Sequence, residues 1–258
     1  MVAITPLASG SSGNSYLVRN RESSFLIDAG LSGKQITERL DSAGVDPSSL
    51  KAILVSHAHI DHIKGIGVLS RKFKIPVFIN EKTFAVAEKT LGKLYRRETF
   101  KTGKMFEFAG FKIHPFSVPH DCADPVGFRI ANGATRFGIA TDLGIVTGLV
   151  RNLLTGLNAV ILESNHDPLM LRDGPYPWEL KQRVRSRLGH LSNDQSAQLL
   201  ESIVSDELRV VILAHMSETN NTEELAEQCA RESLQAFLAQ NGSIFCASQN
   251  RVGPTVEL

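Results

Sequence analysis

The sequence predicts a single mixed α/β domain spanning residues 1–258, with two β-sheets packed face to face and helices outside. The first observation behind this prediction is that short apolar, β-rich runs alternate with amphipathic stretches. The second is that hairpin-linked strands dominate the first part of the chain, whereas helix–strand units follow toward the C-terminus. The third is size, because 258 residues, 42% of them hydrophobic, can bury a sizeable core without disulfides.

Strands are expected where apolar and β-branched residues cluster between turn-forming residues. Asn132-Gly133 separates two such runs and predicts a tight hairpin, because Asn and Gly tolerate the positive φ that the turn requires. In chain order, the expected strands are Val2–Ala8, Tyr16–Arg19, Phe25–Asp28, Ala52–Ser56, Val77–Asn80, Met105–Phe108, Lys112–Val118, Gly127–Ala131, Arg136–Thr141, Ala159–Glu163, Val210–Ala214 and Ser243–Ala247.

Helices are expected where apolar residues recur with helical spacing behind a capping residue. Asp46-Pro47 and Asp167-Pro168 each pair an N-cap acid with a first-turn proline, and Ser192 with Gln195 forms a capping-box pattern. Gly189 is interpreted as the residue just past a helix C-terminus. The expected helices are Gly33–Ala43, Ile63–Phe73, Lys82–Leu91, Pro177–Leu188, Asn193–Ser205 and Thr222–Ala239.

Composition narrows the class of protein. No apolar run approaches the roughly 18 residues of a membrane-spanning helix, and the N-terminal segment lacks the basic start and apolar stretch of a signal peptide. Cys122, Cys229 and Cys246 are odd in number and far apart, which excludes a disulfide framework or a paired-cysteine zinc site. We therefore expect a cytoplasmic protein with no membrane contact.

The formal net charge of +1 hides a segregation of charge along the chain. Residues 71–104 carry ten Lys and Arg against three Glu, a net charge of +7. Residues 169–190 have a net charge of +3, and residues 191–258 have a net charge of −7. This distribution excludes a protein that coats nucleic acid by bulk charge, but it permits one that grips a strand locally.

The most informative segment is an apolar strand that runs into His57, His59, Asp61 and His62. His57 and His59 lie two apart and project to one side of an extended chain, while Asp61 and His62 lie at the turn into a helix. Imidazole and carboxylate ligands suit Zn²⁺, Mn²⁺ or Fe. The alternative, a polar loop, is disfavoured by four ligand-type residues so close together.

Three further donors follow predicted strands downstream. His120, Asp142 and His215 each come directly or almost directly after an apolar run. We expect several strands to deliver these side chains to one edge of the fold, where they could serve a second metal ion.

The order and spacing of these residues resemble the metallo-β-lactamase-fold hydrolase superfamily. The resemblance implies a four-layer αββα sandwich and a dinuclear metal centre. It implies that Asp142 bridges the two ions and that Asp28 supports the ligands without binding metal. The remaining ligands divide between a first metal, held by His57, His59 and His120, and a second metal, held by Asp61, His62 and His215.

Further motifs resemble the bacterial YycJ-like branch of that superfamily, namely Leu7–Ser15, Glu163–Asp167, Gly189–Asn193 and Leu213–Asn221. This branch is similar to ribonuclease J, ribonuclease Z and a cyclic phosphodiesterase, and a 5′-to-3′ DNA exonuclease activity is attributed to it. The resemblance implies a metal-dependent phosphodiesterase acting on nucleic acid, DNA more than RNA, with two Zn²⁺ or Mn²⁺ ions. The chain is too short for the β-CASP insertion of ribonuclease J.

In the implied mechanism, a hydroxide bridging the metals is the nucleophile, because two cations lower the pKa of water. Asp61 and His190 are the expected catalytic residues. His190 would protonate the leaving alcohol, with a phosphate ligand or a structural loop histidine as the alternatives. The expected substrate-binding residues lie in three kinds of segment. Ser12 and Asn14 are in a glycine-rich loop, Asn165 and His166 are close to a helix start, and Arg183 and Arg187 are in a basic segment.

Two other functions remain open from the sequence. A small-molecule hydrolase of the same fold, such as a cyclic phosphodiesterase, a glyoxalase II-like thioesterase or a lactonase, would use the same ligands. A metal- or DNA-binding protein without catalysis is the third possibility, and the apparently complete ligand set argues against it. No sequence feature identifies a protein partner.

Overall fold

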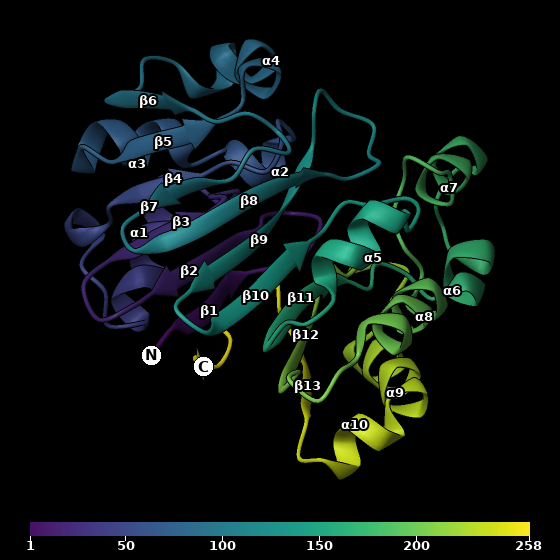
Figure 1. The fold of residues 1–258 in the computed structure, drawn as a ribbon. Coiled ribbons are helices and arrows are strands. Elements are labelled where there is room, and N and C mark those ends of the chain that lie inside the picture. The colour runs from purple at the N-terminus through teal and green to yellow at the C-terminus, as the bar shows by residue number, and fades with distance from the viewer. The chain divides into compact units, whose positions relative to one another are not determined.

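The computed structural model describes residues 1–258, which divide into two compact units, each with its own core (Figure 1). Unit 1 comprises Met1–Pro115, Cys122–Val126 and Ser248–Leu258. Unit 2 comprises Phe116–Asp121 and Gly127–Ala247. None of the helices combines the length and the apolar character that crossing a membrane requires.

Unit 1 contains a mixed sheet in the order β14-β1-β2-β3-β4-β5-β6. The meander β1 to β3 and the short β14 are antiparallel, whereas β3 to β6 are parallel. The strands are β1 (Ala3–Ala8), β2 (Ser15–Arg19), β3 (Ser24–Ile27), β4 (Ala52–Leu54), β5 (Pro76–Ile79), β6 (Arg96–Thr99) and β14 (Val256–Glu257). The helices are α1 (Gly33–Ser42), the 3₁₀ turn η1 (Pro47–Ser49), α2 (Ile60–Ile63), α3 (Ile66–Phe73) and α4 (Glu81–Leu91).

The strands of unit 2 follow the order β13-β12-β11-β10-β9, with β9 and β10 antiparallel and β10 to β13 parallel. They are β9 (Val126–Asn132), β10 (Thr135–Ala140), β11 (Ala159–Glu163), β12 (Val210–Ala214) and β13 (Ser243–Cys246). The short strand β7 (Phe106–Phe108) and β8 (Phe111–Ser117) form an antiparallel hairpin earlier in the chain. The helices are α5 (Gly148–Leu154), α6 (Pro168–Asp173), α7 (Trp178–Val184), α8 (Asn193–Ile203), α9 (Glu223–Ser233) and α10 (Gln235–Ala239).

Helices α5, α8 and α9 lie beside the parallel strands of unit 2, where Figure 1 shows them from teal to yellow. In this sheet Ala140 pairs with Leu162, and Glu163 pairs with Ala214. The ends of β10, β11 and β12 are therefore level with one another. Residues that follow these three strands must emerge at the same edge, which is the arrangement that the sequence predicted for Asp142 and His215.

The predicted strands are all present, with ends that differ by at most two residues. The hairpin at Asn132-Gly133 is confirmed, because Asn132 pairs with Thr135 and Gly133 has a φ of 59°. The capping box of Ser192 and Gln195 is also confirmed. Strand β6 was missed because its sequence, Arg-Arg-Glu-Thr, has no apolar pattern.

Several helix predictions were wrong in extent. The predicted helix Ile63–Phe73 is divided into α2 and α3, and Thr222–Ala239 is divided at Leu234. Helix α5 was not predicted, and α6 was absent from the expected helices although its start was predicted, since Asp167 is its N-cap and Pro168 its first residue. At the first division, a Cβ on Gly65 would lie 2.5 Å from the carbonyl oxygen of Leu31, so only glycine permits this close approach.

The interpretation of Gly189 as a helix C-terminal residue was also wrong. Helix α7 ends at Val184, and the chain then folds back so that the His190 N–H donates to the Val184 carbonyl over 2.9 Å. A Cβ on Gly189 would lie 2.2 Å from that same carbonyl oxygen. The glycine is required by close packing against the end of α7 and not by a left-handed φ.

The expected separation into a hairpin-rich first part and a helix–strand second part does not describe the fold. Each unit has antiparallel strands first and parallel strands afterwards. Strands β4 and β5 were predicted, but their parallel pairing with their neighbours was not.

Candidate metal centre

In unit 1, the chain leaves β4 in extended form and enters α2 with His59 as the N-cap residue. This path brings together the four ligand-type residues predicted there. The ring centroids of His57 and His62 are 4.0 Å apart, and those of His57 and His59 are 4.9 Å apart. His62 Nε2 lies 3.5 Å from Asp61 Oδ2. His57 and His62 are buried, whereas His59 and Asp61 are partly exposed.

Asp28 and Ser56 contact the Nδ1 atoms of His62 and His57 and so orient these two rings. The Nδ1 of His62 donates to Asp28 Oδ2 over 2.7 Å, and the Ser56 hydroxyl lies 3.0 Å from His57 Nδ1. Ser56 in turn donates to both carboxylate oxygens of Asp28, at 2.6 and 2.8 Å. With Nδ1 engaged, Nε2 is the nitrogen of each ring that could bind a metal, which is the arrangement common in histidine metal sites. The Asn14 amide lies 3.0 Å from this nitrogen in His62. Asp28 thus touches a predicted ligand without being one.

In unit 2, the level strand ends bring Asp142 and His215 together, with His215 Nε2 3.3 Å from Asp142 Oδ1. His120 Nε2 lies 3.6 Å from the same oxygen. The Nδ1 of His120 is within 3.1 Å of the Leu188 carbonyl and 3.2 Å of the Gly189 carbonyl, so it is fixed as a donor. These two histidines therefore follow the same rule as those of unit 1, with Nδ1 held by the protein and Nε2 available.

Three of these residues have a left-handed backbone at a strand end. The φ angles are 58° for Asp28, 59° for Asp142 and 55° for His215. Residues other than glycine rarely adopt this conformation, although Asp and His do so more often than most. Strain of this kind persists where the surrounding structure enforces it and concentrates at functional sites. Here it turns the chain sharply just where each strand ends.

Glu163 belongs to the motif Glu163–Asp167, but it was not among the site residues predicted from the sequence. Its side chain is buried, and Oε1 accepts from His190 Nδ1 over 2.8 Å and from His215 Nδ1 over 3.0 Å. The backbone N–H groups of Leu143 and Leu191 donate to Oε2, each over 3.0 Å. Burial raises the pKa of Glu163, but His190 and His215 outweigh that effect and bring the pKa down to about 2.

A signal for Glu163 was present in the sequence. It ends the strand Ala159–Glu163, every residue of which is buried. An acidic side chain in such a place needs partners, because a buried unpaired charge is very costly. Asp142, Glu163, His190 and His215 each offer one ligand-type atom, and these atoms all lie within 4.8 Å of one another.

His190 lies between the buried carboxylate and solvent. Its Nδ1 faces Glu163, its ring lies 5.2 Å from that of His215, and its side chain is 20% exposed. Because Glu163 holds Nδ1, Nε2 is the nitrogen that can carry a proton toward a bound group. This geometry suits a general acid.

Asn165 and His166 were expected to bind substrate, but both are buried. The side-chain amide of Asn165 donates to the His215 carbonyl over 2.8 Å, so it holds the backbone of a predicted ligand. The Nδ1 of His166 has no hydrogen-bond partner. Burial lowers the pKa of His166 from its usual 6.5 to about 4, so this ring is neutral at pH 7.

The loop containing Ser12 and Asn14 is occupied by groups of the protein itself. The side-chain oxygen of Gln249 accepts from the N–H groups of Ser12 and Gly13, at 2.8 and 3.1 Å. Asn14 is buried, and its amide lies 3.0 Å from His62 Nε2 and 3.3 Å from Asp61 Oδ2. Ser12 remains exposed, whereas Asn14 is placed to orient ligands. Gln249 was not identified from the sequence.

The two predicted basic residues differ in availability. Arg183 Nε donates to Asp121 Oδ2 over 2.6 Å, and this bond raises the pKa of Arg183. Arg187 is exposed and has no carboxylate partner. Of the two, Arg187 is the freer cation for a phosphate.

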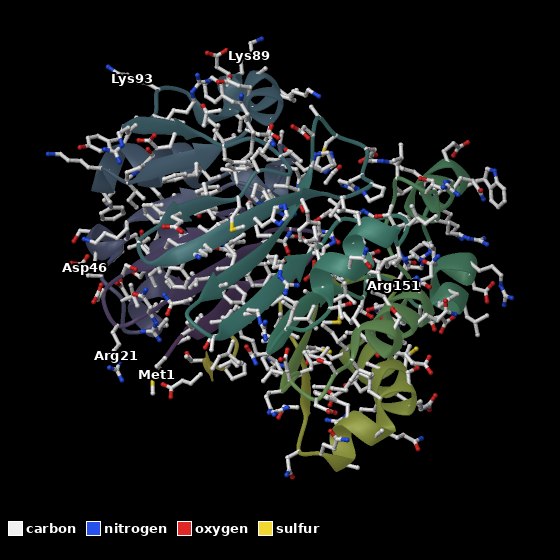
Figure 2. All side chains as sticks on the ribbon, viewed as in Figure 1. Met1, Arg21, Asp46, Lys89, Lys93 and Arg151 are labelled. Carbon is white, nitrogen blue, oxygen red and sulfur yellow. The ribbon has the colours of Figure 1, made fainter.

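The phenylalanines of the basic stretch 71–104 pack against other residues of the protein. Phe100 is buried and stacks on Phe106 with ring centroids 5.8 Å apart, and the Arg97 guanidinium lies 4.2 Å from the Phe84 ring. Lys89 and Lys93 extend outward from their segment (Figure 2). The stretch is a cationic surface, but its phenylalanines are not free to stack on bases.

The donor set fits a divalent metal. Imidazole nitrogens and carboxylate oxygens are its only donors, and the predicted ligands meet within each unit at distances that an ion could bridge. The buried positions of these polar groups also exclude an ordinary solvated loop.

Comparison with known proteins gives a consistent result. A family model described as the metallo-beta-lactamase superfamily matches residues 8–215. An exodeoxyribonuclease YycJ from Bacillus anthracis is 38% identical over 231 residues, 89% of this chain and 88% of the relative. An exodeoxyribonuclease WalJ from Streptococcus pneumoniae serotype 2 (strain D39) is 40% identical over 224 residues, 85% of this chain and 83% of the relative.

A solved structure extends the likeness to the whole fold. The metallo-beta-lactamase fold protein YhfI from Bacillus subtilis superimposes with a TM-score of 0.78 and 17% identity, covering 100% of both chains. The fold class predicted from the sequence, the αββα sandwich of this fold, is confirmed.

Proposed function

Because the chain belongs to the metallo-β-lactamase superfamily, we propose that it is a metal-dependent phosphodiesterase that degrades DNA as a 5′-to-3′ exonuclease. The observation that carries this proposal is the buried Glu163 carboxylate, which orients both His190 and His215 beside Asp142. The two relatives named exodeoxyribonucleases, 38% and 40% identical, support DNA as the substrate.

Two divalent ions, Zn²⁺ or Mn²⁺, are proposed as the cofactors. When bound, they would neutralise phosphate charge and lower the pKa of water. The chain's own residues prepare this site by fixing the histidine rings through Nδ1. The proposed ligands are His57, His59, Asp61, His62, His120, Asp142 and His215.

The remaining task is to supply a proton to the leaving alcohol. His190 would donate it from Nε2, while Glu163 at Nδ1 keeps the ring oriented. Asp61 is held by the Asn14 amide and, with His190, completes the proposed catalytic pair. Arg187 would bind a backbone phosphate of the strand.

The three free cysteines support the predicted cytoplasmic location.

Three substrates test this function. The protein loaded with Zn²⁺ or Mn²⁺ is given DNA labelled at its 5′ end, bis-p-nitrophenyl phosphate and a glutathione thioester. We expect immediate release of the labelled 5′ nucleotide, hydrolysis of the phosphodiester and no thioester turnover. Turnover of the thioester alone would replace the proposal with the small-molecule hydrolase, and no turnover of any substrate would favour a binding protein. The same DNA labelled at the 3′ end should give a ladder, and early loss of that label would reverse the polarity.

A further inference from the structure

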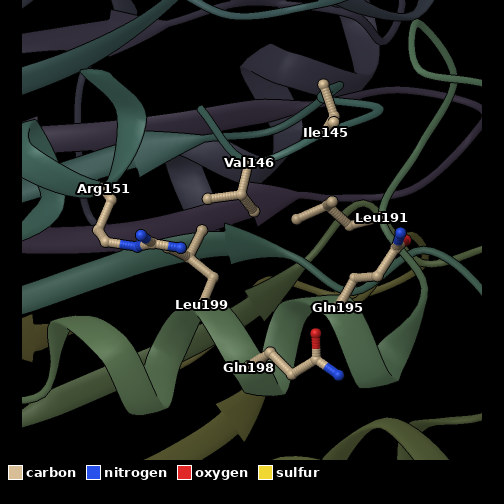
Figure 3. Close-up of a pocket in the computed structure, with 7 residues that line it drawn as sticks. All are labelled: Ile145, Val146, Arg151, Leu191, Gln195, Gln198 and Leu199. Atoms are coloured by element: carbon tan, nitrogen blue, oxygen red, sulfur yellow. The ribbon is translucent and has the colours of Figure 1, made fainter. Parts of the chain in front are cut away.

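A cavity of about 190 Å³ lies in unit 2 between α5, α8 and the segments that follow Asp142 and His190 (Figure 3). Its floor is apolar, formed by Val146, Leu191 and Leu199. Arg151 and Gln195 stand at opposite ends of these apolar side chains in Figure 3. We call this cavity the α5–α8 pocket, and its polar lining consists of Arg151, Gln195 and Gln198.

The α5–α8 pocket is tied to the proposed active site by the chain itself. Leu191 directly follows His190, and its N–H donates to Glu163 Oε2 over 3.0 Å. The same carboxylate orients His190 through Oε1. Val146 follows Asp142 by four residues. Two residues that line the pocket, Val146 and Leu191, are therefore close in sequence to residues of the proposed site. Leu191 thus lines the pocket and lies one residue from the proposed proton donor.

The polar groups of the pocket have unused hydrogen-bonding capacity. Arg151 is exposed and has no carboxylate partner, and Gln198, also exposed, has no side-chain hydrogen bond. Gln195 is partly committed, because its side-chain oxygen accepts from the Ser192 N–H over 3.0 Å, which leaves its NH₂ group free. Gln195 and Gln198 lie three residues apart on α8 and so share one face of the helix.

We infer that the α5–α8 pocket binds one nucleotide of the DNA strand, next to the phosphodiester that is cut. This inference rests on the proposed function. An apolar floor suits the flat face of a nucleobase, and a glutamine amide can donate to and accept from a base edge. A guanidinium matches the geometry of a phosphate. The volume of about 190 Å³ is below the roughly 300–1,000 Å³ of pockets for drug-sized ligands, so the base of a single nucleotide is the appropriate size.

Abasic substitution tests the inference directly. A set of 5′-labelled oligonucleotides, each lacking one base near the 5′ end, is cleaved by the metal-loaded wild type. At one position we expect the missing base to lower kcat/KM about tenfold. In the double variant Arg151→Ala/Gln198→Ala, kcat/KM on intact DNA should fall about tenfold relative to that on bis-p-nitrophenyl phosphate. The penalty for the missing base should then disappear, because the partners of that base are gone.

Matched controls are Arg21→Ala and Gln240→Ala, which alter exposed residues of the same types outside the pocket. Both should keep the wild-type abasic penalty. Melting temperatures of all variants establish that they are folded. An equal abasic penalty in the wild type and the double variant, or no penalty at any position, would overturn the pocket assignment while leaving the exonuclease intact. If the wild type cleaves no DNA strand at all, the proposed function and this inference fall together.

Discussion

The Nδ1 of His190 donates to the buried carboxylate of Glu163 over 2.8 Å. This contact joins the partly exposed His190 ring to the carboxylate that also accepts from His215 Nδ1. The other ring nitrogen of His190, Nε2, is not bonded to Glu163. A single buried acid thus supports both the proposed proton donor and a proposed metal ligand.

Replacing Glu163 with Gln should lower kcat on DNA by roughly 10–100-fold, the range typical of residues that orient metal ligands. The amide is uncharged and can accept from fewer of the four donors that the carboxylate binds. Steady-state kinetics together with elemental analysis measure the effect. Glu201→Gln, an exposed change on α8, is the control and should leave kcat unchanged. Wild-type kcat in Glu163→Gln would remove the residue from the mechanism.

His190→Ala should retain metal but lower kcat on DNA by roughly 10²–10⁴-fold. The loss on bis-p-nitrophenyl phosphate should be much smaller, because p-nitrophenolate leaves without needing a proton. Comparing the two substrates separates a general acid from a phosphate ligand. A phosphate ligand would give equal losses on both substrates, mainly through KM, and that result would refute proton donation.

Arg187→Ala should reduce the slope of log Kd against log salt concentration for DNA by about 1, as expected for the loss of one phosphate contact. Arg183→Ala should reduce it less, because Arg183 is already bonded to Asp121. Salt titrations of duplex binding by fluorescence anisotropy measure both slopes, with Arg21→Ala as the control. Equal slopes for all three variants and the wild type would mean that the segment containing Arg183 and Arg187 is an ordinary solvated surface that does not contact phosphate.

His166 should make the protein less stable in acid. Because burial holds its folded pKa near 4, below the usual 6.5, the unfolded chain binds more protons between these values. Its contribution to stability is complete above about pH 6.5 and is lost as the pH falls toward 4, on the order of 3 kcal/mol in all. Urea unfolding at pH 7 and pH 4.5 in metal-free buffer should therefore show a smaller loss for His166→Gln. A loss equal to that of the wild type would contradict a buried neutral ring.

The sequence predicted the strands well because buried strands have short apolar runs, and it predicted helix extent less well. The division at Gly65 depends on the nearby Leu31 carbonyl, which no local pattern reveals. Likewise, the end of α7 at Val184 depends on a chain reversal through Gly189. Strand β6 has a polar sequence and is recognised only by its pairing with β5.

For the site, residue type and spacing brought out the ligand-type residues, and the family resemblance brought out Asp28, but neither brought out Glu163 or Gln249. The role of Glu163 depends on the register of β11 with β12, which places it level with Ala214 and next to His215. Gln249 reaches Ser12 from a segment 237 residues away in the chain. Such contacts are tertiary, so no local pattern reveals that N–H groups of the glycine-rich loop at Ser12 and Gly13 are already engaged.

The most direct test is release of the 5′ nucleotide from labelled DNA by chelated protein, before and after addition of Zn²⁺ or Mn²⁺, in the wild type and Asp142→Ala. We predict no release by the chelated wild type, recovery with at least one of the two metals, and none at any metal concentration in Asp142→Ala, which elemental analysis should find depleted of metal. Cleavage by the chelated wild type at its full rate, or full activity in Asp142→Ala, would contradict a metal-dependent DNA exonuclease.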